Sequence, residues 1–128
     1  MSSLTKRVFI AFAVEDTTQR DFLVGQARNE KSPFEFVDMS VKEPWDEEWK
    51  KKCRSRIKGC NGVVALISKN TANATGEKFE IKCAIEEGVP IIGLYAYAND
   101  RSPAPTELGS NKVISWTWDG IKKFIDGL

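Results

Sequence analysis

Four glutamates stand close together in the segment TGEKFEIKCAIEEG, residues 75–88: Glu77, Glu80, Glu86 and Glu87. A carboxylate beside aromatic rings suits cleavage of a glycosidic bond, because it can stabilise or attack an oxocarbenium-like carbon while the departing base stacks on a ring. The chain contains no histidine, which excludes Ser-His-Asp and Cys-His catalysis. It also lacks a P-loop and a dinucleotide-binding glycine motif. Carboxylate chemistry is therefore the first hypothesis.

Cleavage of NAD requires few catalytic groups. Nicotinamide leaves as a neutral molecule from a cationic precursor, so no general acid is required. NAD would be the substrate, and no cofactor is expected. The three cysteines lack paired spacing, and without histidine they predict no metal site.

Helical geometry leaves two of the four glutamates in contention. At about 100° per residue, Ile81, Ala84 and Ile85 define the apolar face of a helix. Glu77 projects near the middle of that face and Glu80 lies on its flank, whereas the other two glutamates lie a turn or more further along. Glu77 could point into a crevice or simply place a favourable charge at the helix N-terminus. The residues alone do not choose between Glu77 and Glu80.

The elements that must position these residues alternate between strands and helices. Continuous apolar runs, typical of strands buried on both faces of a parallel sheet, predict strands at 7–13, 34–38, 61–68, 90–97 and 112–116. Amphipathic segments predict helices at 15–29, 40–59, 75–88 and 118–128. This order predicts an α/β fold: a flavodoxin-like three-layer sandwich with a five-stranded parallel sheet, order 2-1-3-4-5, in a single domain over residues 1–128.

Two residue pairs have the spacing of a helix capping box: Asp16 with Gln19, and Ser40 with Glu43. In the second helix an apolar face repeats every four residues: Trp45, Trp49, Cys53 and Ile57. Helices are therefore expected to begin at these capping pairs. For Asp16, an N-cap role is preferred over a role as substrate ligand.

Ligands in such sheets bind beyond the carboxyl ends of the strands, at the switch point between the first and third strands. The residues predicted to line the site are Phe12, Ala13, Asp38, Ser40 and Trp45. Asp38 and Ser40 suit ribose hydroxyls, and Trp45 could stack on a base. Three of these residues have a structural alternative: Ser40 could cap a helix, and the rings of Phe12 and Trp45 could belong to the core.

Phe79 and Cys83 are expected to project away from the apolar face of their helix. An exposed apolar group there could form a wall of the active site or a surface for self-association. Packing of Phe79 against a neighbouring loop is an equal alternative.

Two long stretches resemble a known family. KRVFIAFAVEDTTQRDF (6–22) resembles the first strand and helix of TIR-like proteins, especially the bacterial Thoeris antiphage TIR proteins. GVVALISKNTANATGEKFEIKCAIEEGVPIIGLYAY (62–97) is similar to the family's strand, loop, E-I-x-x-A helix and following strand. The spacing E-I-x-x-A-I followed by G-V-P-I-I is fairly specific, and the two stretches cover about half of the chain.

The resemblance implies a TIR-like fold and an NAD glycohydrolase or cyclase. TIR enzymes cleave the nicotinamide–ribose bond of NAD, and Thoeris members make cyclic ADP-ribose-type signals that activate a partner effector. The glutamate that begins E-I-x-x-A falls on Glu80, which the resemblance makes the catalytic residue. Many TIR enzymes carry a tryptophan four residues earlier, where this chain has Gly76, and Ala13 and Val14 occupy positions that are often polar. The resemblance also implies self-association.

Two alternatives belong to other classes: a non-enzymatic TIR-like interaction module, and a nucleoside deoxyribosyltransferase-like enzyme with a glutamate nucleophile. The net charge of +1 predicts neither nucleic acid nor an anionic membrane as partner. The chain has no apolar run of membrane-spanning length, and its first residues do not resemble a signal peptide. Free cysteines suit a reducing compartment, so a cytoplasmic location is expected.

Overall fold

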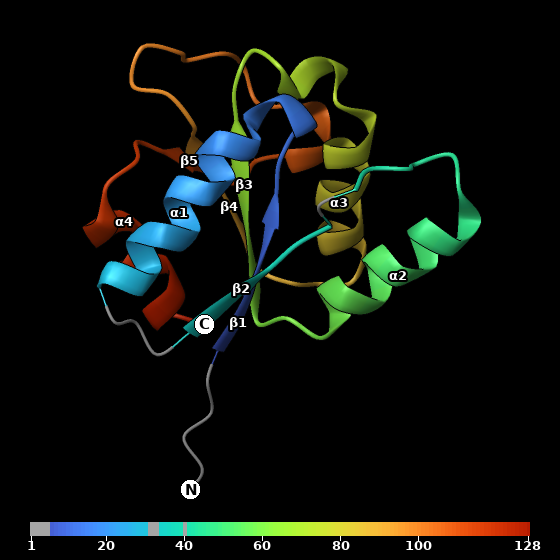
Figure 1. Ribbon diagram of the computed structural model, residues 1–128, viewed down its shortest axis with the longest axis horizontal. Helices are drawn as coiled ribbons and strands as arrows, with labels where there is room; N and C mark the ends of the chain where they lie inside the picture. Colours follow the sequence, from blue (N-terminus) through green and yellow to red (C-terminus); the bar gives the residue numbers. More distant parts are fainter. Residues whose placement is uncertain (1–5, 31–33, 40) are drawn as a thin grey trace, which may run out of the picture.

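A parallel sheet of five strands, in the spatial order β2-β1-β3-β4-β5, forms the centre of the molecule (Figure 1). The computed structural model describes residues 6–30, 34–39 and 41–128. The strands are β1 (Lys6–Ala11), β2 (Phe34–Val37), β3 (Gly62–Ile67), β4 (Ile91–Tyr95) and β5 (Val113–Ile114). All four neighbouring pairs run parallel. The predicted flavodoxin-like α/β fold and its strand order are confirmed.

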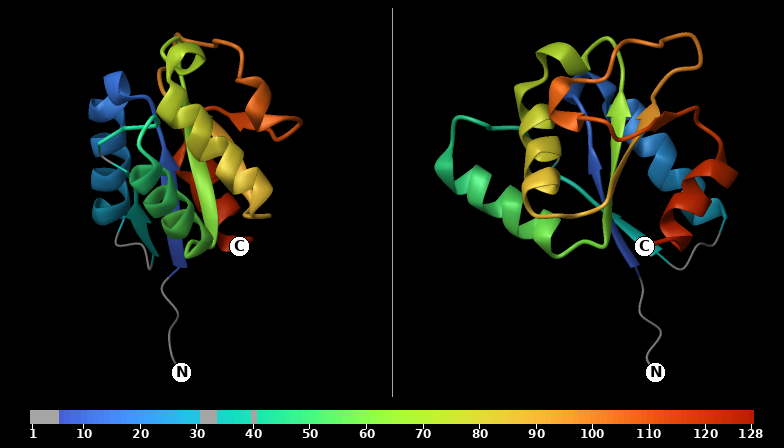
Figure 2. Two further views of the ribbon diagram at one scale, coloured as in Figure 1. Left: turned by 90° about the vertical axis from the view of Figure 1, so that its right-hand side faces the viewer. Right: turned by 180° about the vertical axis from the view of Figure 1, so that it is seen from behind.

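Helices cover both faces of the sheet. The α-helices of the described residues are α1 (Thr17–Asn29), α2 (Glu47–Lys58), α3 (Thr75–Glu86) and α4 (Trp118–Asp126). Short 3₁₀ helices are η1 (Val14–Asp16), η2 (Thr71–Asn73) and η3 (Thr106–Leu108). Helices α1 and α4 lie on one face and α2 and α3 on the other (Figures 1 and 2). The molecule is therefore a three-layer sandwich.

Strand β1 shows how the sequence produces two cores. Val8 and Ile10 pack with α1 and α4, whereas Phe9 and Ala11 pack with α2 and α3. All four are fully buried, because successive side chains of a strand point to opposite faces and both faces are covered. The continuous apolar run seen in the sequence is the result of this double burial.

Helix α3 is buried on two sides, because it contacts the sheet and also α2. The rings of Trp49 in α2 and Phe79 in α3 lie 5.7 Å apart, and Cys83 is fully buried. Ile85 is 42% exposed. The expectation that Phe79 and Cys83 project away from the packed face, with Ile85 inside it, was therefore wrong. Contact with α2 rotates the buried arc of the helix away from Ile85.

Helix α2 begins at Glu47, later than the predicted capping box at Ser40, which lies outside the described residues. The Asp46 carboxylate provides the N-cap and accepts a hydrogen bond at 2.9 Å from the backbone N–H two residues later. Pro44 would fall inside the predicted helix, where its missing N–H is unfavourable. Trp45 consequently precedes the helix and is 76% exposed, so the predicted four-residue repeat starts only after it.

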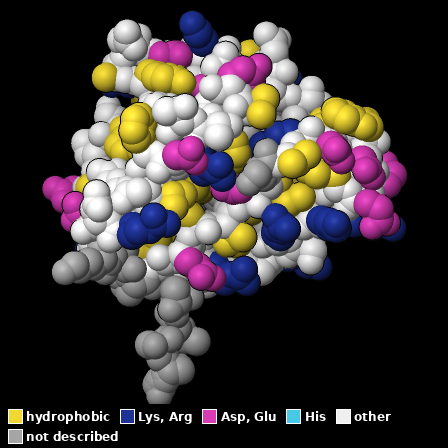
Figure 3. Space-filling view, in the orientation of Figure 1, with side chains coloured by type: hydrophobic (Ala, Val, Ile, Leu, Met, Phe, Trp, Pro, Cys, Tyr) yellow, Lys and Arg dark blue, Asp and Glu magenta, His cyan; other side chains and the backbone are white. Residues whose placement is uncertain are grey.

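The surface carries charges of both signs. Figure 3 shows acidic and basic side chains interspersed with apolar groups over one face, as expected for 19 basic and 18 acidic residues. Within residues 6–30, 34–39 and 41–128, no helix combines the length and apolarity needed to cross a bilayer.

Candidate functional site

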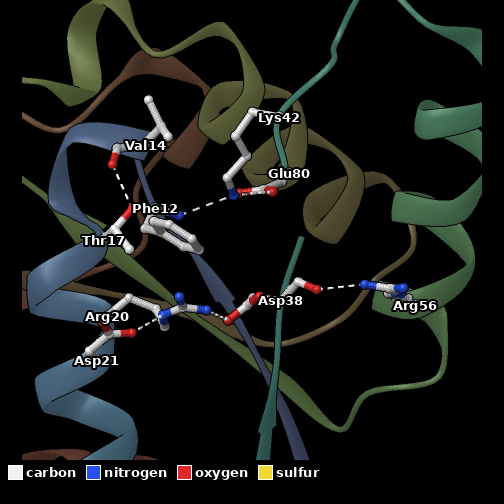
Figure 4. Close-up of polar contacts among 9 residues, drawn as sticks. All are labelled: Phe12, Val14, Thr17, Arg20, Asp21, Asp38, Lys42, Arg56 and Glu80. Carbon is white, nitrogen blue, oxygen red and sulfur yellow. Dashed lines mark hydrogen bonds and ion pairs between the residues drawn. The ribbon is translucent and has the colours of Figure 1, made fainter. Parts of the chain in front are cut away.

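Glu80 belongs to α3, but its carboxylate lies at the carboxyl end of β1. The side chain is fully buried, with 0% exposed. The backbone N–H of Phe12 donates to Glu80 Oε1 at 3.4 Å, and the Lys42 ammonium donates to Oε2 at 2.6 Å. Figure 4 shows the three side chains converging from the residue that follows β1, from α3 and from the segment that follows β2. Both oxygens of Glu80 are thus occupied by donors.

Lys42 covers Glu80 and also rests on an aromatic ring. Its Nζ lies 3.8 Å from the centroid of the Phe12 ring, a cation–π contact, and its side chain is only 9% exposed. The Arg20 guanidinium lies 5.2 Å from the same centroid. A Cβ atom on Gly76 would lie 3.0 Å from Lys42 Cβ. The missing side chain at Gly76 therefore lets the aliphatic stem of Lys42 cross the start of α3.

The two glutamates at this end of α3 differ in their electrostatic environment. Burial raises the pKa of Glu80 to about 7, although the charge and hydrogen bond of Lys42 and the Phe12 N–H act in the opposite direction. Burial, and then the charge of Glu80, raise the pKa of Glu77 well above its ordinary value. The shifts therefore favour the protonated form of Glu77 and leave Glu80 partly ionised at neutral pH.

A cavity of about 420 Å³ opens beside this cluster. It is lined by Phe12, Ala13, Val14, Glu15, Lys42, Pro44, Trp45, Asn73, Ala74, Thr75, Gly76 and Glu77. Four residues predicted for the site therefore meet at one cavity: Phe12, Ala13, Trp45 and Glu77. Glu80 lies behind the cavity wall formed by Lys42 and Phe12.

The remaining predicted residues lie elsewhere. The Asp38 carboxylate binds Arg20 at 2.6 Å, and its backbone carbonyl oxygen accepts from Arg56 at 2.7 Å (Figure 4). Asp38 does not line the cavity, and contact with ribose hydroxyls stays a prediction. Phe79 packs on Trp49 of the neighbouring helix α2, not against a loop as its structural alternative proposed. Ser40 lies outside the described residues.

Asp16 joins three segments at the same edge of the sheet. Its buried carboxylate accepts hydrogen bonds from Ser68 Oγ at 2.5 Å, Asn70 Nδ2 at 2.9 Å and the Tyr97 hydroxyl at 2.9 Å. It makes no side-chain bond to the start of α1, although it occupies the N-cap position. Gln19 donates instead to the Ala96 carbonyl oxygen. The predicted capping box was wrong, because long-range donors bind this carboxylate in place of the local N–H groups.

Comparison with known proteins identifies the family. The family described as "Thoeris protein ThsB, TIR-like domain" matches residues 9–101, which is more than half of the chain. The chain belongs to this family. The predicted TIR-like resemblance is confirmed, and the matched range of this Thoeris TIR-like protein contains Phe12, Lys42, Gly76 and Glu80.

A solved structure supports the fold alone. The crystal structure of a 3-dehydroquinate dehydratase-like protein from Bifidobacterium longum is 14% identical, with a TM-score of 0.51, and the match covers 97% of this chain and 94% of that chain. No curated protein sequence matches the chain.

Sequence reasoning missed the role of Lys42 in the Thoeris TIR-like site. The residue lies in the segment after the second strand, which was expected to border the crevice, but no local spacing links it to Glu80, 38 positions away. Its position between Asp38 and Trp45 was the available signal. Among the described residues, no group of three or more Cys, Asp or Glu side chains is arranged to hold a metal ion.

Proposed function

We propose that this Thoeris TIR-like protein cleaves the nicotinamide–ribose bond of NAD, with Glu80 as the catalytic carboxylate. The observation that carries the proposal is the cation already seated between the Phe12 ring and Glu80. The nicotinamide ring of NAD is itself cationic, so it can take the place that the Lys42 ammonium occupies. A buried carboxylate at that place favours the positive charge that develops on the ribose.

The reaction requires Lys42 to move. Glu80 is fully buried and each of its oxygens already accepts a hydrogen bond, so no substrate atom can contact it in the arrangement described. Displacement of Lys42 exchanges one cation for another on the Phe12 face. This exchange limits the desolvation penalty, because Glu80 keeps a positive partner when the substrate binds.

The bond-breaking step then follows from the charges. The C1′–N bond breaks, and its electron pair leaves with neutral nicotinamide. The Glu80 carboxylate stabilises the oxocarbenium-like C1′ or attacks it. Water gives ADP-ribose and releases a proton, whereas attack by a nucleophile within the same molecule gives a cyclic ADP-ribose-type product. Such a product would act as the antiphage signal to a downstream effector.

Glu80→Gln tests the assignment. Concentrated protein is incubated with NAD, released nicotinamide is measured, and the products are identified by mass spectrometry. We expect the variant to lose activity by about 100- to 1,000-fold, the effect of removing one preorganised electrostatic group. Glu86→Gln is the matched control, because Glu86 lies on the same helix, at the surface, and binds Arg54. Equal activity in wild type and Glu80→Gln would remove the assignment.

A second candidate function is a non-enzymatic interaction module. Val14, Val41 and Trp45 are all exposed, and the first and last of them border the cavity. Exposed apolar side chains at one site favour a protein contact. Absence of nicotinamide release at high protein concentration would favour this module, and base exchange on deoxynucleosides would favour the transferase-like alternative.

A further inference from the structure

Glu77 is buried without any polar partner. Among the residues that the structure describes, it alone has buried side-chain oxygens that make no hydrogen bond, and this holds for both oxygens. The Thr71 hydroxyl is close enough to lower the pKa of Glu77, but in the structure it donates to the Leu66 carbonyl oxygen at 3.3 Å. An unpaired buried acid destabilises a protein, so it needs an explanation other than folding. A ligand that completes its hydrogen bonds provides one.

The surroundings of Glu77 indicate what kind of ligand fits. Glu77 borders the cavity of about 420 Å³ together with Phe12, Trp45 and Lys42. Its side chain is 0% exposed, so a ligand reaches the carboxyl oxygens only when the cavity wall moves, as it must for Glu80. This volume is within the range of small-molecule sites. Two aromatic rings at the wall suit a planar ring, and the ion-paired Lys42 shows that a cation is accepted on the Phe12 face. The fitting ligand is therefore a planar, cationic ring with a polar group for Glu77.

The protonation of Glu77 specifies that polar group. Burial, followed by the neighbouring charge of Glu80, raises the pKa of Glu77 well above its ordinary value and favours the neutral acid; the Thr71 hydroxyl and Lys42 act in the opposite direction, and Asp16 in η1 adds to the rise. A neutral carboxylic acid offers one O–H donor and one carbonyl acceptor. A primary carboxamide offers the complementary carbonyl acceptor and N–H donor. A ligand carboxylate, in contrast, has no N–H group to donate to the carbonyl oxygen of the Glu77 acid.

We propose that Glu77 is a specificity-determining residue that binds the carboxamide of the nicotinamide ring. The inference rests on the proposed function, since Glu80, three residues further along α3, would then act on the attached ribose. The carboxamide completes both hydrogen-bonding positions of Glu77, and the ring lies against the aromatic wall. The leaving group is thereby selected by a residue other than the one that acts on the ribose.

Binding of an N1-methylated ring, which keeps the positive charge of the NAD ring, tests this assignment without any reaction. N1-methylnicotinamide and N1-methylnicotinate, called nicotinamide and nicotinate below, are titrated into wild type, Glu77→Gln and Glu77→Met, with NMR or calorimetry as readout. Wild type should prefer nicotinamide by about tenfold or more, and Glu77→Met should weaken nicotinamide binding by a similar factor. Glu77→Gln should remain within about threefold of wild type, because an amide also offers one donor and one acceptor. Glu86→Gln is again the control.

Thermal unfolding separates a ligand-binding role from a structural one. A raised native-state pKa means that stability is lost as pH rises through that pKa. Glu77→Met removes the acid, so it should unfold at a higher temperature than wild type, by roughly 5 °C at about pH 8, with a smaller difference at about pH 5. Lower stability of Glu77→Met at both pH values would indicate a structural role and overturn the proposal.

The remaining outcomes distinguish the two proposals. Glu77-dependent nicotinamide binding without NAD cleavage would refute the proposed function and support the carboxamide site. NAD cleavage by Glu77→Met with unchanged KM, together with unchanged nicotinamide binding, would refute the carboxamide site and leave the role of Glu80 intact. Equal binding of nicotinamide and nicotinate by wild type would also refute it, whatever the fate of the variants.

Discussion

At the scale of residues, two glutamates three positions apart are both fully buried but differ in their partners. Glu80 is held by a backbone N–H and by Lys42, whereas Glu77 has no hydrogen bond. Helical geometry left the two residues in contention, and the structure brings both to the site. Glu80 faces the end of β1 behind Lys42, and Glu77, which is equally buried, borders the cavity. Under the two proposals, Glu77 and Glu80 contact different parts of one NAD molecule.

The pH dependence of the proposed reaction follows from Glu80. Its pKa of about 7 means that the reactive carboxylate forms as pH rises through neutrality, so kcat/KM should increase over that interval. The charge and hydrogen bond of Lys42 lower this pKa, and Lys42→Met should therefore move the rise to higher pH. Rate profiles of both proteins for NAD check this. An identical acidic limb in the two proteins would show that Glu80 does not control it.

At the scale of elements, the Asp16 network fixes the edge of the sheet on which the site is built. One carboxylate connects η1 with the turn that follows β3 and with Tyr97 beyond β4. That turn leads through η2 directly into α3. The network therefore positions the start of the helix that carries both glutamates.

Asp16→Ala should lower the free energy of unfolding by about 2–4 kcal/mol, because it leaves three donors without their acceptor. Urea denaturation measures the change. Asp21→Ala is the control: Asp21 pairs with Arg20 at the surface, and its loss should change stability by about 1 kcal/mol or less. Equal effects of the two variants would contradict a network role for Asp16.

The elements also show what the sequence could predict. Apolar runs such as residues 61–68 identified the strands, because burial on both faces leaves a continuous signal in the chain. The contact of α2 with α3 has no such signal, so Cys83 and Ile85 were assigned to the wrong sides of their helix. Capping spacings failed at Asp16, where long-range hydrogen bonds determine the side-chain conformation. Lys42 was overlooked because its partner Glu80 is also distant in the sequence, so no local pattern links the two residues.

At the scale of the whole molecule, exposed apolar side chains near the cavity predict self-association. Val14, Val41 and Trp45 are exposed, and a second copy that covered them would also shield the cavity from water. We propose that activity depends on this contact. The observed arrangement, with Lys42 over Glu80, then represents the resting protein.

Specific activity toward NAD should therefore rise with protein concentration across a dilution series. Val41→Ser should need about fivefold more protein to reach the same specific activity, the effect of truncating one apolar interface contact. Phe22→Ser is the control, because Phe22 is a comparably exposed side chain on α1. Specific activity that is independent of concentration would argue against assembly.

The contact between Gly76 and Lys42 has a consequence for how such sites diverge. A side chain at position 76 would press on the stem of Lys42, since an added Cβ would already lie 3.0 Å from Lys42 Cβ, closer than ordinary van der Waals contact. A bulky ring at position 76 would therefore require the stem of Lys42 to move aside. The two positions, 34 residues apart in the numbering, should be inherited as a pair: a change at one creates selection for a change at the other.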